Sequence, residues 1–275
     1  MRLSVALVLA LTLLVPVVAD AKTEQIEAVS RHYADSHPGL ESYRVKIKTN
    51  KIDEMLGRMT ASMPQDVPRP DTPELMKFWK RGAGTVVRSM TATAAPYMEQ
   101  MINRFSQRFA IDLGTLFLPI EKEAERSKLL QAGTVKDSVT EIAGSTINHV
   151  EITFGTPTDL AGAFFGTSLD LPQRAINRLA LDIDPQRNIL VHMDIETDKT
   201  PKLAVDIRHL DIANNDLPSE VSITSPDGSI DEKLVTTFTE LQGYHLPVKQ
   251  ERKIRRPGLE EELLVEFSDY ELVVQ

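Results

Sequence analysis

Residues 179–195 read LALDIDPQRNILVHMDI, and this stretch decides the fold class. Every second residue from Leu179 to Ile183 is apolar, and so is every second residue from Ile189 to Ile195. The same alternation returns in residues 203–207, LAVDI. Because successive side chains of a strand point to opposite faces, the pattern predicts strands with one apolar and one polar face. Such sheets are typically antiparallel, and their apolar face must be covered by helices, by a second sheet or by a ligand.

The end of the chain specifies the register of its last hairpin. Pro257 and Gly258 fit the centre of a type II turn, whose second central residue needs a positive φ. With this centre, three opposite-charge pairs share the polar face: Lys249 with Glu266, Lys253 with Glu262, and Arg255 with Glu260. The other face carries the apolar residues Val248, Ile254, Leu263, Val265 and Phe267. A slip of one residue would destroy this sorting, so the register is well specified.

Elsewhere the spacing of apolar residues predicts both helices and strands. Helices are predicted over residues 23–36 and 119–131, and residues 51–63 suit either a strand or a short helix. Hairpins are predicted over 75–90 and 135–154, and a change of phase predicts a β-bulge near Arg208 and His209. A Thr cap followed by Pro predicts a very short helix that opens at 156–159, and residues 171–178 favour one more helical turn.

The N-terminus has the pattern of a secretory signal peptide. Arg2 supplies a positive start, residues 3–18 are mostly apolar, and residues 19–21 read ADA, a small-x-small cleavage pattern. The apolar run is shorter than the ~20 residues of a membrane-spanning helix. We therefore expect residues 1–21 to be removed after Ala21 and the protein to be exported, with a retained anchor as the alternative.

The composition limits the classes of partner. Removing residues 1–21 takes away one Arg and one Asp, so Lys and Arg fall from 31 to 30, Asp and Glu from 40 to 39, and the net charge stays at -9. An acidic chain argues against nucleic acid as a partner, because binding phosphates needs a basic face. It also argues against electrostatic docking on anionic membranes. The chain has no cysteine, so it has no disulfide and no lipid-attachment cysteine.

No catalytic or metal-binding pattern is present in the sequence. The six histidines have no zinc-ligand spacing, and we expect those in the strands to lie on the polar face of the sheet. A G-x-S-x-G motif is absent, so we predict a protein without catalysis and without a cofactor. A basic cluster near the C-terminus could bind anions, but neighbouring glutamates favour a solvated strand face; its members are Lys249, Arg252, Lys253, Arg255 and Arg256.

Apolar side chains are the remaining candidates for function. Trp79 is the only tryptophan. Residues 97–109 form a Met- and Phe-rich helical stripe, and Phe164 and Phe165 add aromatic surface. These residues either fill a core or leave a cavity above the sheet, since both need the same side chains. The candidate ligand-binding residues are Trp79, Met98, Met101, Phe105, Phe109, Phe164 and Phe165.

The order of elements resembles the superfamily of outer-membrane lipoprotein carrier and sorting proteins. The resemblance rests on a helix at 24–33 leading to the strand SYRVK at 42–46, on LDIDP at 181–185 followed by NILV at 188–191, and on GYHLP at 243–247 before a charged strand. It implies an α+β fold, in which a curved antiparallel half-barrel sheet is covered on its concave side by helices. It also implies a periplasmic protein that binds acyl chains or lipidated partners in the half-barrel.

These observations predict a signal peptide over 1–21 and one half-barrel domain over 22–275, with a helical insert near 91–131. The insert is larger than the compact carriers need. The expected function is non-catalytic binding of lipids or lipidated proteins in the periplasm, without a membrane span, metal or nucleic acid. The alternative is a cell-envelope protein-interaction or sensor module of the same fold without a lipid ligand.

Overall fold

The computed structural model describes residues 21–61, 72–90, 116–142, 144–166, 175–198, 202–212 and 215–275, with residues 64, 66 and 100. The described helices are α1 (Ala21–Ala34), α2 (Asn50–Ala61), the 3₁₀ helix η2 (Ile120–Lys122) and α4 (Glu123–Ala132). The strands are β1 (Leu40–Thr49), β2 (Leu75–Lys80), β3 (Gly84–Ser89), β4 (Thr134–Ile142), β5 (Ser145–Asp159), β6 (Ala175–Asp184), β7 (Ile189–Glu196), β8 (Leu203–Ile212), β9 (Asn215–Thr224), β10 (Asp231–Leu241), β11 (Tyr244–Arg256) and β12 (Leu259–Val274).

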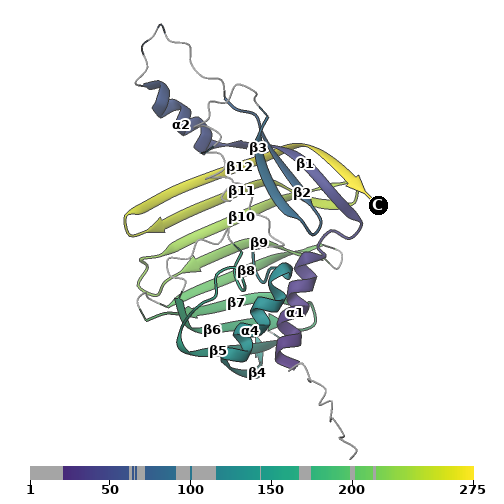
Figure 1. Cartoon of the computed structure of the whole chain (residues 1–275), viewed down its shortest axis with the longest axis vertical. Helices are drawn as coiled ribbons and strands as arrows, with labels where there is room; N and C mark the ends of the chain where they lie inside the picture. Colours follow the sequence, from purple (N-terminus) through teal and green to yellow (C-terminus); the bar gives the residue numbers. More distant parts are fainter. Residues whose placement is uncertain are drawn as a thin grey trace, which may run out of the picture.

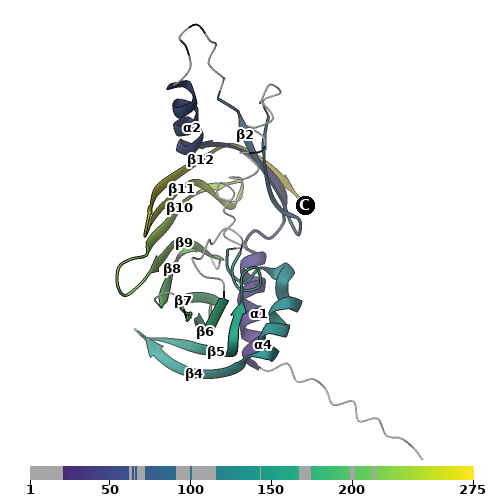
Figure 2. The same cartoon turned by 60° about the vertical axis from the view of Figure 1, so that its left-hand side comes forward.

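The strands form one open sheet of 12 strands in the order β3-β2-β1-β12-β11-β10-β9-β8-β7-β6-β5-β4. Neighbouring strands pair antiparallel throughout this order. The sheet is strongly curved, and β3 and β4 are its two free ends (Figures 1 and 2). The antiparallel, two-faced sheet predicted from residues 179–207 is therefore confirmed.

One face of the sheet is largely buried from β5 to β2, and we call it the inner face. Leu181 lies opposite Met193, Met193 opposite Val205, and Val205 opposite Ile223, so strand pairing carries the apolar parity from β6 to β9. All four of these side chains are buried. At the other end, Ile47 of β1 lies opposite Phe267 of β12 and Leu75 of β2, so the inner face continues to the far end of the sheet.

The helices pack at different ends of this sheet. α1 packs on β7 and against α4, which also contacts β4, whereas α2 packs on β12 at the opposite end (Figures 1 and 2). The buried apolar residues accordingly form two clusters. The lower cluster joins α1, residues 116–118 and residues 160–165 to β5–β10. The upper cluster joins α2 to β1–β3, β11 and β12.

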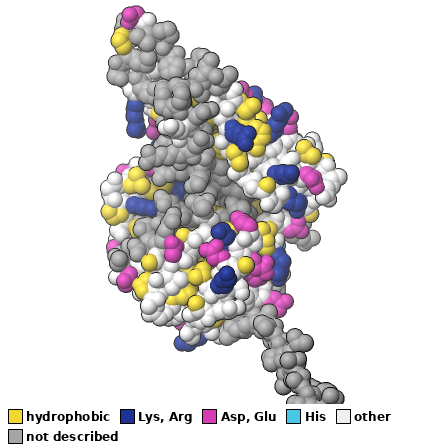
Figure 3. Space-filling view, in the orientation of Figure 1, with side chains coloured by type: hydrophobic (Ala, Val, Ile, Leu, Met, Phe, Trp, Pro, Cys, Tyr) yellow, Lys and Arg dark blue, Asp and Glu magenta, His cyan; other side chains and the backbone are white. Residues whose placement is uncertain are grey.

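The outside of the molecule is charged, with both signs mixed. Around α1 and α4, acidic and basic side chains lie side by side, with hydrophobic side chains between them (Figure 3). None of the helices in the described part of the chain is long and apolar enough to cross a membrane.

The predicted last hairpin has the predicted register. Lys249 lies opposite Glu266, Lys253 opposite Glu262, and Arg255 opposite Glu260, and Gly258 has φ +76°, as the turn requires. The bulge expected near Arg208 and His209 is also present, as a register shift between these two residues. Opposite charges and turn chemistry therefore sufficed to set these strands.

Two predicted helical turns are wrong. Residues 156–159 extend β5, because Thr158 and Asp159 pair with Ile176 and Ala175 after a register shift. Pro157 is tolerated there because it lies in the irregular segment between the two paired regions. Residues 161–166 then form turns, and Gly162 has φ +88°, which no α-helix contains. Residues 175–178, assigned to a second helical turn, begin strand β6.

The remaining elements agree with their predictions. Residues 50–61, which suited a strand or a helix, are helical. The predicted helices at 23–36 and 119–131 correspond to α1 and to η2 with α4, and the two predicted hairpins are β2–β3 and β4–β5. The Met- and Phe-rich stripe at 97–109, and with it most of the predicted insert, lies outside the described residues.

Candidate ligand-binding face

The inner face of the sheet is not apolar throughout. Four polar side chains on β10 and β11 are at most 5% exposed: Glu232, Thr236, Gln250 and Arg252. We call them the polar belt. Thr236 lies directly opposite Gln250, and Glu232 opposite Ile254, two residues from Arg252. The belt lies where the lower cluster ends on β10 and the upper cluster begins on β11, and it therefore divides the inner face into two apolar areas.

The charges of the belt are paired. Arg252 Nη2 lies 3.1 Å from Glu232 Oε2, and Arg256 Nε and Nη2 donate to Glu232 Oε1. Gln250 Nε2 donates to Thr236 Oγ1 over 3.4 Å. A buried carboxylate is tolerated because two guanidinium groups donate to it, and removal of either partner would leave a buried charge.

This pairing corrects the solvated strand face predicted for the basic cluster. Arg252 is 5% exposed and points to the inner face. It has the same parity as Ile254, so the two-residue period of a strand places both on one face. Arg256 is not solvated either, because its side chain is 13% exposed and binds Glu232. The other three members, Lys249, Lys253 and Arg255, have exposed side chains as expected.

Aromatic rings line the upper apolar area. Trp79 stacks on Tyr43 with 5.3 Å between ring centres, and Tyr270 meets Tyr43 edge-on at 5.5 Å. The ammonium of Lys77 lies 5.7 Å from the ring centre of Tyr43 and 5.6 Å from that of Phe267, and Lys77 is 1% exposed. Cation–π attraction to two rings stabilises a buried ammonium. This area therefore combines flat apolar surfaces with a buried positive charge.

The hydroxyl of Tyr270 is held within the same area. It donates to the carbonyl of Pro247 over 2.5 Å. Burial raises the pKa of Tyr270 above its usual value, because the phenolate would lose its hydration. The ring is therefore a neutral part of the aromatic surface.

Helix α1 is fixed over the lower area by a buried ion pair. Arg126 of α4 lies 2.8 Å (Nε) and 2.5 Å (Nη2) from the two carboxylate oxygens of Glu27 on α1. Its Nη1 donates to the carbonyls of Pro119 and Ala163, and Nη2 also donates to Ser30 Oγ. Because every side of the guanidinium is used, this residue joins α1, α4 and residues 160–165 into one unit.

The other end of α1 is held to β7 and β8. Leu190 N–H donates to Tyr33 Oη over 3.0 Å, and Tyr33 Oη lies 2.9 Å from His209 Nε2, with the two rings nearly parallel. Burial lowers the pKa of His209 to about 4, so its imidazole is neutral at pH 7 and shares a hydrogen bond with the Tyr33 hydroxyl. Burial raises the pKa of Tyr33 above its usual value.

His209 is a second correction. We expected the strand histidines on the polar face, and His149 and His192 are there, bound to Asp182 at 2.6 Å and Asp206 at 2.7 Å. His209 shares the parity of Val205 and Ile207, so the two-residue period of β8 itself places its side chain on the inner side, next to Tyr33 of α1. The extra residue of the bulge is Ser219 on β9, so the alternation along β8 continues and Leu210 is 41% exposed.

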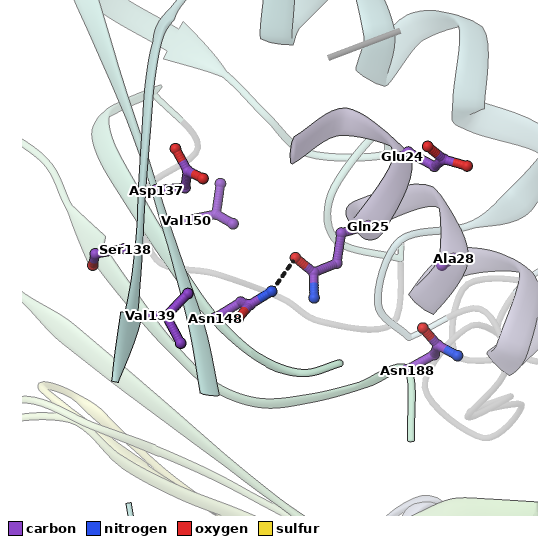
Figure 4. Close-up of a pocket in the computed structure, with 9 residues that line it drawn as sticks. All are labelled: Glu24, Gln25, Ala28, Asp137, Ser138, Val139, Asn148, Val150 and Asn188. Carbon is purple, nitrogen blue, oxygen red and sulfur yellow. Dashed lines mark hydrogen bonds between the residues drawn. The ribbon is translucent and has the colours of Figure 1, made fainter. Parts of the chain in front are cut away.

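A pocket of about 350 Å³ opens between the first turns of α1 and the β4–β5 hairpin (Figure 4). Glu24, Gln25 and Ala28 line it from α1, and Asn148 Nδ2 donates to Gln25 Oε1 over 2.8 Å across it. Val150, at its base, belongs to the lower cluster. The pocket therefore reaches from the surface to the lower apolar area.

The predicted ligand-binding residues lie in two separate places. Trp79 is partly exposed at the edge of the upper area. Phe164 and Phe165 are at most 1% exposed and pack in the lower cluster, where Phe165 bridges to Phe117. The structure therefore does not bring Trp79 together with the phenylalanine pair. Met98, Met101, Phe105 and Phe109 lie outside the described residues.

Sequence reasoning missed the belt, Lys77 and the Arg126–Glu27 pair, although weak signals exist. Lys77 shares parity with Leu75 and Trp79 in β2, and Arg126 lies one helical turn before the buried Leu130. A charged residue at a position where the strand or helix pattern expects an apolar one was thus the signal of a buried charge. Within the described chain no group of three or more His, Asp or Glu side chains is placed to hold a metal ion.

No family model and no curated protein matches the sequence. Among solved structures, the fold matches an outer membrane lipoprotein-sorting protein domain from Vibrio parahaemolyticus, with 7% identity, TM-score 0.36, and coverage of 91% of this chain and 93% of that one. A LolA superfamily protein from Nitrosomonas europaea matches with 9% identity, TM-score 0.28, and coverage of 91% and 94%.

A DUF1329 family protein from Desulfovibrio piger matches with 9% identity, TM-score 0.27, and coverage of 92% and 93%. The family that the sequence resembles is thus among the solved structures that this fold matches. These TM-scores are low, so the matches alone carry no argument about what this chain binds.

Proposed function

We propose that this protein is a periplasmic, non-catalytic binding protein for lipids or lipidated proteins, which holds acyl chains against the inner face of a half-barrel. The observation that carries the proposal is that inner face itself. Its apolar parity runs from β5 to β2 across a curved sheet, and a buried polar belt divides it into two apolar areas. A sheet that only needed a core would gain nothing from buried ion pairs, because apolar residues of similar volume stabilise at least as well.

Acyl burial supplies enough free energy for such a function. Each buried CH₂ contributes ~0.8 kcal/mol, so an eight-carbon difference in buried length corresponds to roughly 6 kcal/mol before ordering costs. The aromatic surface formed by Trp79, Tyr43 and Phe267 presents flat apolar contacts suited to chains. We therefore expect weak discrimination between acyl chains and strong rejection of polar ligands.

The proposal includes the export and organisation expected from the sequence. Residues 1–21 are removed after Ala21, and residues 22–275 form one domain whose helices cover the concave side. Met98, Met101, Phe105 and Phe109 lie outside the described residues, and we propose that they contact the acyl chain. Arg126 and Tyr33 support this arrangement, because they fix α1 on the same side of the sheet.

The test is native mass spectrometry of the mature protein purified from the periplasm, followed by lipid extraction and uptake of a fluorescent fatty acid. We expect a co-purifying lipid and saturable uptake. Trp79→Ser and Met101→Ser should weaken uptake, whereas Ile142→Ser, at a position 54% exposed at the end of the edge strand β4, should not.

Absence of both lipid and uptake would contradict the proposal. A stoichiometric protein partner captured by crosslinking, with an interior free of ligand, would instead support the envelope interaction module.

A further inference from the structure

A groove of about 600 Å³ crosses the outer face of β1–β3 beside the end of β12. Phe78 of β2 and Val86 of β3 lie directly opposite each other in it, and Trp79 also lines it. Gly84, at the start of β3, contributes no side chain, and nothing lies within 4 Å of the position that a Cβ would take there. The groove is therefore apolar along its floor and open at one end.

Two cations flank this floor. Lys80 follows Phe78 by two residues and Arg88 follows Val86 by two, so both share the outer face. Because β2 and β3 are antiparallel, they lie at opposite ends of the groove, ~13 Å apart along the strands. In the part of the chain that the structure describes, neither side chain forms an ion pair, whereas Arg44 in the same groove binds Glu271 at 2.5 Å. The groove is thus locally positive in an acidic chain.

Exposed hydrophobic residues gather at the same corner. Val86 and Met90 are 48% and 53% exposed at the β3 edge, and Val273 is 56% exposed at the end of β12. Figure 3 shows hydrophobic side chains together with basic side chains over β1–β3. Singly scattered apolar residues need no explanation, but a group of them around two cations marks an interaction surface.

We propose that this corner docks on the surface of an anionic phospholipid bilayer. Lys80 and Arg88 bind lipid phosphates, and Val86, Met90 and Val273, which share the parity of the outer face, enter the interfacial region. Cations beside aliphatic side chains are the combination that holds peripheral proteins on such surfaces. The net charge of -9 does not prevent this, because screening limits each charge to about 10 Å and the corner is locally basic.

A bilayer fits this corner better than an acidic peptide does. The exposed valines and Met90 lie on two different chain segments around the groove rather than in one line along it. An extended peptide would need its apolar contacts in a row at the strand repeat. The inference does not rest on the proposed function, since a protein with no lipid in its half-barrel could dock in the same way.

The experiment is binding of the mature protein to vesicles of phosphatidylcholine alone and of phosphatidylcholine with phosphatidylglycerol, followed by sedimentation. Binding is read from the protein that sediments with the vesicles, because the ring of Trp79, the only tryptophan, stacks on Tyr43 on the inner face. We expect binding to the anionic vesicles only, with loss at high salt. Lys80→Gln with Arg88→Gln should weaken binding roughly thirtyfold, about fivefold for each cation.

Matched variants separate the corner from the charge of the whole chain. Lys128→Gln with Lys136→Gln makes the same charge change on α4 and β4 and should leave binding unchanged. Val86→Ser with Val273→Ser should weaken binding with no change in charge. Thermal unfolding checks that each variant folds.

Three results would overturn the proposal: no binding to anionic vesicles, equal losses in the two charge variants, or binding of an acidic peptide at the groove without vesicle binding. The presence or absence of lipid inside the half-barrel tests the proposed function only. It does not affect the results of the vesicle experiment.

Discussion

At the scale of single residues, the position of α1 depends most on Arg126, which binds more groups than its neighbours do. It is fully buried and donates to Glu27, Ser30 and two backbone carbonyls. A buried cation with this many partners stabilises mainly by preventing unpaired charges, not by its own net contribution. Removal of Arg126 should therefore destabilise the protein mainly by leaving the Glu27 carboxylate buried without a partner.

Arg126→Met should lower the free energy of unfolding by ~3–5 kcal/mol, because Glu27 would remain buried without a partner. Adding Glu27→Gln should recover part of the loss by removing the charge. Urea unfolding of both variants measures this. If the double variant is no more stable than the single one, Glu27 is not the cause of the loss.

Two histidines, His209 and His192, should make the stability of the protein depend on pH in opposite directions. Burial holds the pKa of His209 at about 4, below its unfolded value of ~6.5, so the unfolded state binds the proton more tightly. Stability should be complete above pH ~6.5 and fall by ~3 kcal/mol towards pH 4. His209→Gln should flatten this decline in urea unfolding measured against pH.

His192 is the natural control for this pH series. Its pKa is raised: burial opposes the rise, but the carboxylates of Asp206 and Asp194 outweigh it. Its contribution is therefore present below pH ~6.5 and lost as the pH rises through the folded value. His192→Gln should therefore lower the stability below pH ~6.5 and remove the decline with pH in this upper range. A common response of both variants would contradict the two environments described here.

At the scale of elements, the β11–β12 hairpin depends on one backbone conformation. Gly258 has φ +76° with open space around it, so only the backbone conformation opposes a side chain there. Gly258→Ala should destabilise by ~1 kcal/mol. Gly57 also has open space, but it lies in helix α2, so Gly57→Ala should stabilise by ~0.5–1 kcal/mol. Thermal unfolding of the pair checks the opposite signs, and equal signs would contradict the turn.

The elements also show what the sequence could and could not predict. Register in the last hairpin followed from three charge pairs and one turn, since a slip would mismatch all of them. Arg252 and His209 are misplaced from sequence alone, because a polar side chain is taken as exposed. In the fold, strand parity decides for both: Arg252 shares the face of Ile254, and His209 shares the face of Ile207. The helix expected at 156–165 failed because pairing of Thr158 with Ile176 outweighed a local cap, and such distant pairing leaves no local signal.

At the scale of the whole molecule, one continuous sheet carries two cores. Among the described residues, the lower cluster holds 29 buried apolar residues and the upper cluster holds 12. The polar belt lies between them, and belt hydrogen bonds add little apolar contact across the boundary. The upper end of the sheet should therefore open at lower free energy than the lower end.

Native-state hydrogen exchange tests this division with two matched substitutions. Val265 and Val205 are at most 1% exposed, one in each cluster. Val265→Ala removes ~2 kcal/mol of burial and should speed exchange in β1, β2 and β12 while β6–β8 keep their protection. Val205→Ala should speed exchange in both halves, because the smaller upper cluster cannot remain folded on an open lower sheet. Equal acceleration everywhere by Val265→Ala would mean that the strand hydrogen bonds, which run unbroken through the belt, couple the two cores into one cooperative unit.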